Sequence, residues 1–580
     1  MTPSSDSTSA APHPAPHRRL IALLWPERAD IAIIVLFSVF TGLLYLASPL
    51  AVDAVVNNIS FGGQEPVYKQ TLLVLALALL VFLVVLSLVS AAQYLVVELI
   101  QQRIFVRLAG DLTRRLPRLL YGALERTKRP ELVNKFLDVV TVQKSCAVIL
   151  LDGVNVVLSM LIGLLVVAFY HPFLLVFDLL LILGLLAVVY PLGRNGVRTS
   201  IAESYAKHAV AGWFEQVVLF PVLFKCPGAA EFSNRRTDNL VGTYLTARKA
   251  HFRILLRQIL ALLALQALAS AMLLAIGGLL VLQGELTLGQ LVASELIVSA
   301  IVASLVSLGK HIENWYDALA ATDKLGSIVD LPVESADGEA TPPAEGPLGV
   351  EVRDLAFAYQ RGRPLFNDLR LSVAAGERLA ITGPTGAGAG TLLELIFRLR
   401  LPCAGMVLLD GVDARHWQLD ALRRQVALVR EAEIVEGTLL ENVRLGRPDI
   451  SAADVQEALE QVGLMPAVLR LPEGMHTPLH PGGRPLSDSQ RIRLCLARVI
   501  LGSPRLILVD KLLDGLDPGE AAPLLRALFD GPRRWTLVVA TRDEDIRRHC
   551  DRVFRLGVDS VAGAAAGPGV GGGHPSATET

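Results

Sequence analysis

The chain has 580 residues, of which 52% are hydrophobic and 19% are charged, and its mean hydropathy is +0.48. Soluble chains have about 45–50% apolar and about 25% charged residues, so this composition favours a membrane protein. The net charge of −1 excludes a polycation that holds nucleic acid by bulk charge. The five cysteines show no metal-binding spacing, which excludes a disulfide scaffold and a zinc module.

The N-terminal region is rich in Pro, Ser and Ala and lacks a long apolar run. Residues 1–17 are therefore predicted to be a disordered tail rather than a secretory signal peptide. The residues that follow, beginning with Arg18 and Arg19, are typical of a short helix at a membrane surface. Because no peptidase domain with a Cys/His pair precedes the apolar region, we expect no processing of a leader peptide.

Six apolar segments come next. A helix crosses the hydrocarbon core of a bilayer in about 20 residues, and each segment is close to that length. Six transmembrane helices are therefore predicted within a membrane domain that covers residues 18–330. The six segments are residues 31–52, 71–92, 153–170, 173–192, 259–284 and 286–309.

The connections between these segments differ in length and charge. Two are long, residues 93–147 and 193–258, and they carry most of the Lys and Arg, whereas those at 53–70, 171–172 and 285 carry almost none. Because positive residues mark the cytoplasmic side, the pattern predicts cytoplasmic long connections and termini. Both long connections are rich in helix formers, so we expect the membrane helices to extend into the cytoplasm.

Two acidic residues lie inside the apolar segments, Asp178 in the fourth and Glu295 in the sixth. Charged groups within a bilayer are functional candidates, because their burial there is costly. Asp178 and Glu295 are therefore candidates for a substrate cavity that prefers a cationic substrate. Alternatively, they fix the packing of the helices.

A second domain follows the membrane region. Residues 331–347 are rich in Pro, Gly and Glu and are predicted to be a linker. From 348 to 558, short β-branched runs alternate with amphipathic stretches, which indicates an α/β domain. Residues 559–580 are rich in Gly and Ala, and we expect a flexible tail there.

A glycine-rich loop lies between a predicted strand and a predicted helix of this domain. In this context glycines let backbone N–H groups surround a phosphate at the start of a helix. A working loop ends in Lys, which reaches the β- and γ-phosphates, followed by Ser or Thr, which holds Mg²⁺. Here those two positions are alanine and glycine, and a threonine comes one residue late. The candidate nucleotide-binding residues are Gly383, Gly386, Gly388, Ala389, Gly390 and Thr391.

Taken with the six apolar segments, this domain resembles that of an ABC exporter half-transporter, over residues 18–558. Tyr359 resembles the aromatic residue that stacks on adenine, and Asp510 ends a strand that resembles Walker B. The family's LSGGQ signature corresponds to Leu486, Ser487, Asp488, Ser489 and Gln490. The resemblance implies an α-helical membrane domain with six transmembrane helices, joined to an α/β nucleotide-binding domain of the P-loop NTPase type.

The departures from the family pattern fall on positions that handle the γ-phosphate, Mg²⁺ and water. The Walker A Lys and Ser are replaced by Ala389 and Gly390. The other replacements are Arg430 or Glu431 for the Gln of the Q-loop, Asp488 and Ser489 for two signature glycines, Lys511 for the catalytic Glu and Arg542 for the switch His.

These replacements predict a site that does not hydrolyse ATP. Phosphoryl transfer depends on positioning and charge stabilisation, and loss of one major electrostatic partner costs about 100- to 1000-fold in rate. A lysine side chain is protonated at pH 7 unless it is strongly desolvated, so Lys511 cannot accept a proton from water. No catalytic residue is intact, ATP binding is expected to be weakened, and Mg²⁺ binding is disfavoured.

Two interpretations of the altered charges remain open at this stage. In the first, Lys511 and Arg542 act as counter-charges in place of Mg²⁺ and the missing Lys, which allows metal-independent nucleotide binding. In the second, the site has drifted, and Lys511 pairs with Asp510 or with solvent.

The resemblance also implies a dimer, in which each nucleotide lies between Walker A of one chain and the signature of the other. Asp488 then either brings a carboxylate near the partner's γ-phosphate or points to solvent while Ser487 contacts the phosphate. We therefore expect a heterodimer with an ATPase-competent half-transporter in a bacterial inner membrane, with the nucleotide-binding domain and both termini in the cytoplasm.

Two alternatives are a homodimeric transporter that binds ATP weakly and a non-transporting scaffold or sensor. A periplasmic adaptor is a further candidate partner, and nucleic acid is not expected to bind. The sequence does not identify the transported substrate.

Overall fold

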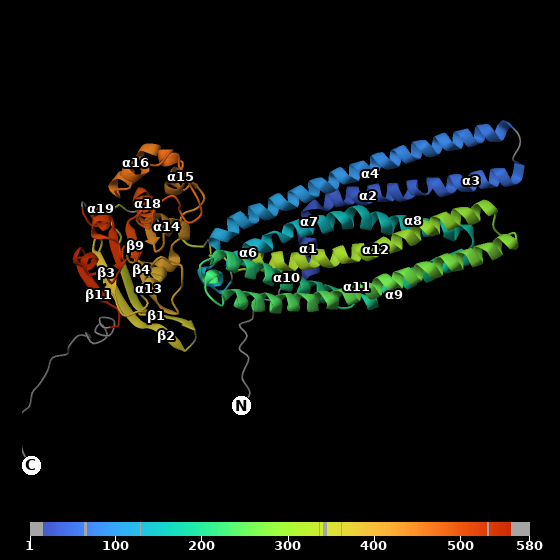
Figure 1. Ribbon diagram of the computed structural model, residues 1–580. Coiled ribbons are helices and arrows are strands. Elements are labelled where there is room, and N and C mark those ends of the chain that lie inside the picture. The colour runs from blue at the N-terminus through green and yellow to red at the C-terminus, as the bar shows by residue number, and fades with distance from the viewer. Residues whose placement is uncertain are drawn as a thin grey trace, which may run out of the picture. The chain divides into compact units, whose positions relative to one another are not determined.

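The computed structural model divides the chain into two compact units, Met1–Val333 and Glu334–Thr580 (Figure 1). The structure describes residues 15–62, 66–127, 129–335, 337–339, 345–360, 362–530 and 533–557. The predicted tail at 559–580, most of the predicted tail at 1–17, and residues 336 and 340–344 of the predicted linker lie outside the described residues.

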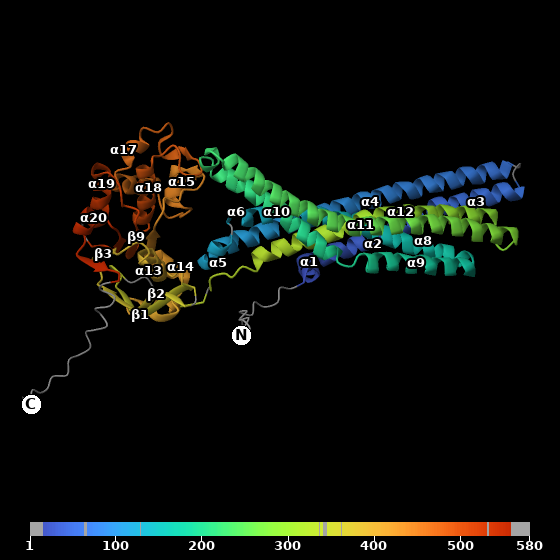
Figure 2. The same ribbon diagram turned by 60° about the horizontal axis from the view of Figure 1, so that its bottom comes forward.

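The first unit is built from helices, in which α11 runs beside α12 and α4 runs beside α2 (Figures 1 and 2). Its elements are α1 (Pro16–Leu24), η1 (Trp25–Glu27), α2 (Arg28–Tyr45), α3 (Ala47–Gly62), α4 (Pro66–Arg115), η2 (Leu116–Arg118), α5 (Tyr121–Arg126), α6 (Arg129–Phe136), α7 (Asp138–Val148), the π-helix η3 (Ile149–Gly153), α8 (Val154–Tyr170), α9 (Pro172–Leu192), α10 (Gly196–Leu219), η4 (Leu223–Lys225), α11 (Ala229–Leu282) and α12 (Leu288–Val329).

Three of these helices are much longer than a bilayer requires. Helix α4 has 50 residues, α11 has 54 and α12 has 42. At 1.5 Å per residue, α11 is about 80 Å long, whereas a hydrocarbon core is about 30 Å thick. The expected helical extension through the long connections is therefore confirmed. The predicted connection at 53–70 is mostly helical instead, since α3 ends at Gly62 and α4 begins at Pro66.

Within the described part of the chain, five helical segments are long and apolar enough to cross a membrane, judged by length and composition. They are Pro16–Ile59, Gln70–Arg118, Asn134–Tyr170, Pro172–Leu192 and Ala229–Leu282. The sixth predicted segment falls on α12, whose apolar part among the described residues is Leu288–Ile301. Helix α12 begins with a capping box, in which the Thr287 hydroxyl and the Gln290 amide bond each other's backbone N–H groups.

The two acidic residues of the apolar segments differ in burial. Asp178 lies on α9 and is only 3% exposed, among apolar neighbours such as Phe177 and Leu181. Neither of its carboxylate oxygens has a hydrogen-bond partner among the described residues. Glu295 lies on α12 and is half-buried, and its Oε2 also lacks such a partner. Asp178 is thus enclosed by protein rather than exposed on the outside of the unit.

The described residues of the second unit form an antiparallel sheet of order β2-β1-β4-β5, a parallel sheet of order β11-β3-β10-β9-β6, and a small pair, β7-β8. The strands are β1 (Val350–Gln360), β2 (Arg363–Val373), β3 (Arg378–Thr382), β4 (Ala404–Leu409), β5 (Val412–Asp413), β6 (Val426–Val429), β7 (Gly437–Thr438), β8 (Pro478–Leu479), β9 (Leu506–Asp510), β10 (Thr536–Ala540) and β11 (Arg552–Arg555).

Helices cover this sheet core (Figure 2). They are α13 (Ala389–Ile396), η5 (Ala414–His416), α14 (Leu419–Gln425), α15 (Leu439–Arg444), α16 (Ala452–Gln461), α17 (Met465–Val468), η6 (Gly474–His476), α18 (Asp488–Leu501), α19 (Pro518–Phe529) and α20 (Glu544–Arg548). Leu379, Leu508 and Val538, from three neighbouring parallel strands, pack in one apolar cluster with Leu392 and Ile396 of α13. This packing fixes the start of α13 at the carboxyl edge of the sheet.

A buried charge network ties three helices of the first unit together. Lys324 of α12 is 0% exposed, and its Nζ lies 2.8 Å from Oδ2 of Asp138 on α7. His208 of α10 contacts both, with its Nε2 3.2 Å from Asp138 Oδ2 and its Nδ1 2.9 Å from Lys324 Nζ. A buried charge is tolerated only when it is paired, so each member depends on the others.

We expect Lys324→Met to lower the free energy of unfolding by about 3 kcal/mol or more, because it leaves the Asp138 carboxylate buried without its ammonium partner. Thermal melting of the purified chain in lipid measures this. Lys225→Met is the matched control, since Lys225 lies exposed in η4. Equal melting temperatures for the two variants would contradict a structural role for the network.

Candidate functional site

The glycine loop lies at the carboxyl edge of the parallel sheet, between β3 and α13. Gly386 and Gly388 have φ angles of 88° and 94°, in the left-handed region that favours glycine. A Cβ at Gly388 would lie 2.6 Å from the ring of Phe366, so a larger residue does not fit there. The loop and the first turn of α13 therefore have the backbone form of an anion site.

The loop faces a cavity of about 320 Å³. Its wall includes Gly383, Gly386, Gly388, Ala389, Gly390 and Thr391, as the sequence predicts for one site. Three cations from other segments also line it, namely Arg430, Lys511 and Arg542. The structure thus brings the predicted Walker A, Q-loop, catalytic Glu and switch positions together around one cavity.

Tyr359 lies at the side of the cavity, and 56% of its surface is exposed. Its hydroxyl is 2.8 Å from the Thr391 hydroxyl, and the Arg400 guanidinium lies 4.8 Å from the centre of its ring. The Thr391 hydroxyl is therefore engaged by Tyr359. Its late position in the sequence does not make it a substitute for the metal-binding serine.

A buried carboxylate that sequence reasoning missed organises the floor of the site. Glu394 of α13 is only 4% exposed and accepts hydrogen bonds from both Arg400 and Arg430. Arg430 Nη2 also lies 3.6 Å from Asp510 Oδ2. The signal that could have revealed it is a lone Glu in the apolar helix sequence LLELIF, which requires a buried cation as partner.

Of the two residues proposed for the Q-loop position, Arg430 lines the cavity. Glu431 is exposed and does not contribute to the wall. The guanidinium of Arg430 links Glu394 to Asp510, so the side chain at this position connects the helix after the glycine loop with the end of β9.

Asp510 and Gly390 lie against each other. A Cβ built on Gly390 would be 2.5 Å from Asp510 Oδ2, so the space that a serine side chain would need is closed by the carboxylate. Burial raises the pKa of Asp510 from its ordinary value, and the nearby Arg430 and Lys511 oppose that rise. Asp510 Oδ1 is buried without a hydrogen-bond partner among the described residues.

The site does not fit Mg²⁺ as the family arrangement would hold it. No hydroxyl is present at position 390, that of Thr391 is bonded to Tyr359, and a guanidinium already lies beside Asp510. A divalent cation placed there would meet the positive charges of Arg430 and Lys511. The glycine loop, by contrast, does fit the phosphates of a nucleotide.

Lys511 and Arg542 occupy the positions of the catalytic Glu and the switch His. Lys511 is exposed, and its backbone has a φ of 56° and donates to the Ala540 carbonyl at 2.9 Å. Arg542 Nη2 donates to the Thr385 hydroxyl at 2.7 Å, and its backbone N–H bonds Asp514 at 3.2 Å. Neither side chain forms an ion pair with any residue that the structure describes. Both charges are therefore available to an anion in the cavity.

The signature residues lie at the start of α18, outside this cavity. Ser487 caps the helix and Gln490 completes the capping box, with Ser487 N donating to Gln490 Oε1 at 2.9 Å. Leu486 and Ser489 are buried. The Asp488 side chain is 87% exposed and pairs with Arg491 one turn later, which partly neutralises its charge.

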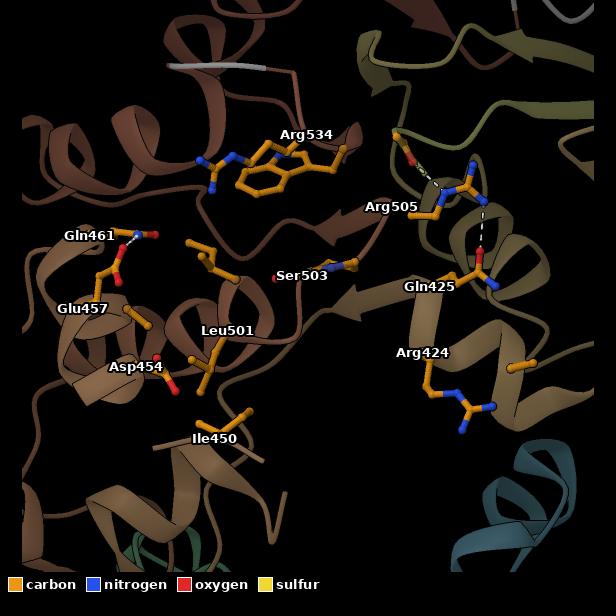
Figure 3. Close-up of a pocket in the computed structure, with 16 residues that line it drawn as sticks. Arg424, Gln425, Ile450, Asp454, Glu457, Gln461, Leu501, Ser503, Arg505 and Arg534 are labelled. Carbon is orange, nitrogen blue, oxygen red and sulfur yellow. Dashed lines mark hydrogen bonds between the residues drawn. The ribbon is translucent and has the colours of Figure 1, made fainter. Parts of the chain in front are cut away.

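A larger cavity of about 640 Å³ lies elsewhere in the second unit and shares no residue with the glycine loop (Figure 3). Gln425 of α14 accepts a hydrogen bond of 2.9 Å from Arg505, and Glu457 of α16 accepts one of 3.2 Å from Gln461. Arg424 lies exposed at its edge. The cavity lacks a phosphate-binding loop, so its size does not make it the nucleotide site.

Both units match models of known protein families. A family model described as the ABC transporter transmembrane region matches residues 31–209, and one described as ABC transporter matches residues 366–513. The structure of a bacterial Atm1-family ABC exporter with ATP bound superposes with a TM-score of 0.81 at 22% identity, over 91% of this chain and 94% of that chain. The fold is therefore a helical ABC exporter membrane domain fused to an ABC nucleotide-binding domain.

Curated relatives match over shorter stretches. An uncharacterised ABC transporter ATP-binding protein, YfiC of Bacillus subtilis, is 29% identical over 49% of this chain and 48% of its own length. The alpha-hemolysin translocation ATP-binding protein HlyB of Escherichia coli is 28% identical over 48% and 40% respectively. A multidrug efflux ATP-binding/permease protein of Mycobacterium bovis is 31% identical over 53% and 25%. The chain spans about half or less of the length of these relatives.

Restoring the serine at position 390 is expected to be unfavourable. Gly390→Ser should lower the free energy of unfolding by about 1 kcal/mol relative to Gly519→Ser, because its Cβ displaces the Asp510 carboxylate. Both glycines are the second residue of a helix, and a Cβ at Gly519 meets nothing within 4 Å. Thermal melting of both variants measures the difference, and a melting temperature for Gly390→Ser at or above that of the control would refute the close approach.

Proposed function

We propose that this chain, which joins the membrane region and the nucleotide-binding domain of ABC transporters in the fold of an ABC exporter, is a half-transporter subunit whose own ATP site does not hydrolyse ATP. In this proposal the chain works as a dimer with a second half-transporter that has intact motifs. Binding of ATP at the degenerate site is weakened, and Mg²⁺ is not required there.

The observation that carries the proposal is the set of cations around Asp510. Attack by water requires a carboxylate or another base that accepts or orients its proton. At that position the chain has the exposed Lys511 in place of a carboxylate. Arg430 lies beside the Asp510 carboxylate on the other side. Ala389 stands in place of the Walker A Lys as well, and Glu394, the carboxylate among the described residues that line the cavity, is bonded to Arg400 and Arg430.

The signature supports a heterodimer over a homodimer. A partner's nucleotide would meet Ser487 and Asp488 at the start of α18. The Ser487 hydroxyl still caps this helix and Arg491 offsets the Asp488 charge, so one composite site would keep a usable signature face. A homodimer would combine the degenerate cavity with this altered signature twice.

The membrane unit supports a transport role. We assign it to a bacterial inner membrane, with the second unit and both termini in the cytoplasm, following the distribution of Lys and Arg between its connections. Asp178 and Glu295 are the candidate substrate-cavity residues. Both carboxylate oxygens of Asp178 and Oε2 of Glu295 lack a hydrogen-bond partner among the described residues, which suits a cationic substrate. A periplasmic adaptor remains a candidate partner.

ATP hydrolysis by the purified chain in lipid, alone and mixed with a candidate partner, tests the proposal. We expect no turnover by the chain alone above that of Asp510→Asn. The mixture should hydrolyse ATP in a way that depends only on the Walker A Lys of the partner. Turnover by the chain alone that is lost on mutating Asp510 would refute the proposal, and silence in both cases would favour a scaffold or sensor.

A single reversion should not restore catalysis. Lys511→Glu is expected to leave the chain alone without measurable turnover, because the Walker A Lys and hydroxyl are still missing and losses at such sites are non-additive. The measurement is steady-state phosphate release at saturating ATP with Mg²⁺. Recovery of turnover in Lys511→Glu would show that Lys511 is the sole block to catalysis.

A further inference from the structure

The cavity beside the glycine loop has a charge pattern that suits an anion without its metal. Arg400 and Arg430 are matched by the carboxylates of Glu394 and Asp510. Lys511 and Arg542 have no carboxylate partner among the described residues, so the group of six carries a net formal charge of about +2. A nucleoside triphosphate is about two charges more negative without Mg²⁺ than with it.

The position of Arg430 supports anion binding independently of the net charge. Its guanidinium contacts Glu394 and Asp510, and it lines the same cavity as the glycine loop. In a working site, the metal ion lies beside the Walker B aspartate and binds the phosphates. Arg430 lies beside the corresponding aspartate here. Gly390 lets the Asp510 carboxylate come close to the start of α13, which closes the remaining space next to it.

We propose that Arg430 is a built-in cation that takes the place of the divalent metal, so that this cavity binds a metal-free nucleoside triphosphate. The inference rests on the proposed function, since it concerns the same site, which is proposed not to hydrolyse ATP. Lys511 and Arg542 supply the remaining counter-charge, and Tyr359 provides an exposed ring at the side of the cavity for the base. The site then holds nucleotide as a structural ligand and does not consume it.

Arg542 contributes at the opposite edge of the loop. Its guanidinium reaches the Thr385 hydroxyl within the glycine loop at 2.7 Å, while its backbone is fixed through Asp514. This places a planar donor group next to the backbone N–H groups of the loop. Arginine suits this role because its guanidinium binds phosphate oxygens with several donors at once.

The test is calorimetric titration of the purified full chain in lipid nanodiscs with ATP, in EDTA and in Mg²⁺. Wild type should bind with affinities that agree within about threefold in the two conditions, whereas Arg430→Gln should lose about tenfold or more in EDTA. Arg430→Lys, which keeps the charge, should stay within about threefold of wild type. Arg424→Gln is the matched control, because it removes an exposed arginine at the edge of the other cavity (Figure 3).

Arg430→Lys also distinguishes loss of the positive charge at position 430 from loss of folding. A variant that merely unfolded would lose binding in both conditions and show a lowered melting temperature, whereas the Lys variant retains the pairing with Glu394. Equal affinity of wild type and Arg430→Gln in EDTA would overturn the inference, as would binding by wild type that requires Mg²⁺ or no binding at all.

Those results leave the proposed function intact, because a site that binds no nucleotide is still catalytically silent. Hydrolysis of ATP by the chain alone would count against the proposed function and not against the inference. It would overturn the proposed function, whereas metal-free binding in EDTA would still stand as measured.

Discussion

The parallel order of β3, β9 and β10 is the constraint on which the candidate site depends. Parallel strands place their carboxyl ends at one edge of a sheet, and ligands of α/β proteins bind there. The glycine loop after β3, Lys511 after β9 and Arg542 after β10 therefore meet around one cavity, although more than 150 residues separate the first from the last. The apolar strands behind these positions pack in one cluster with α13, and Ala387 and Ala389 pack against the same cluster.

Much of the fold follows from pattern alone. Apolar segments of membrane-spanning length predict the helical unit, and β-branched runs such as ERLAIT and RLILVD predict β3 and β9. Boundaries are harder to predict. Residues 53–70 are polar enough to suggest a connection, yet α3 and α4 continue through most of them, because a helix satisfies its own backbone hydrogen bonds outside the apolar zone as well as inside it.

At the candidate site, the sequence predicts where residues lie better than it predicts which side chains pair. The resemblance to ABC exporters predicts that Gly388, Arg430, Asp510 and Lys511 belong to one region, and all four lie at or beside the cavity. Spacing does not tell which side chains pair. The hydrogen bond between the hydroxyls of Tyr359 and Thr391 joins residues 32 positions apart, and it follows from the tertiary structure. Sequence reasoning considered Lys511 and Arg542 as replacement cations, but the cation closest to Asp510 on the inner wall is Arg430.

Glu394 shows how the charged residues of the altered site depend on one another. A carboxylate that is 4% exposed in an apolar helix is costly unless cations pair with it, and here two arginines do so from different segments. Removal of either arginine leaves Glu394 with a single partner, and removal of Glu394 places two guanidinium groups beside an unfilled apolar position. The three residues are therefore interdependent. In the proposed metal-free site, these buried partners hold Arg430 in place at the cavity wall.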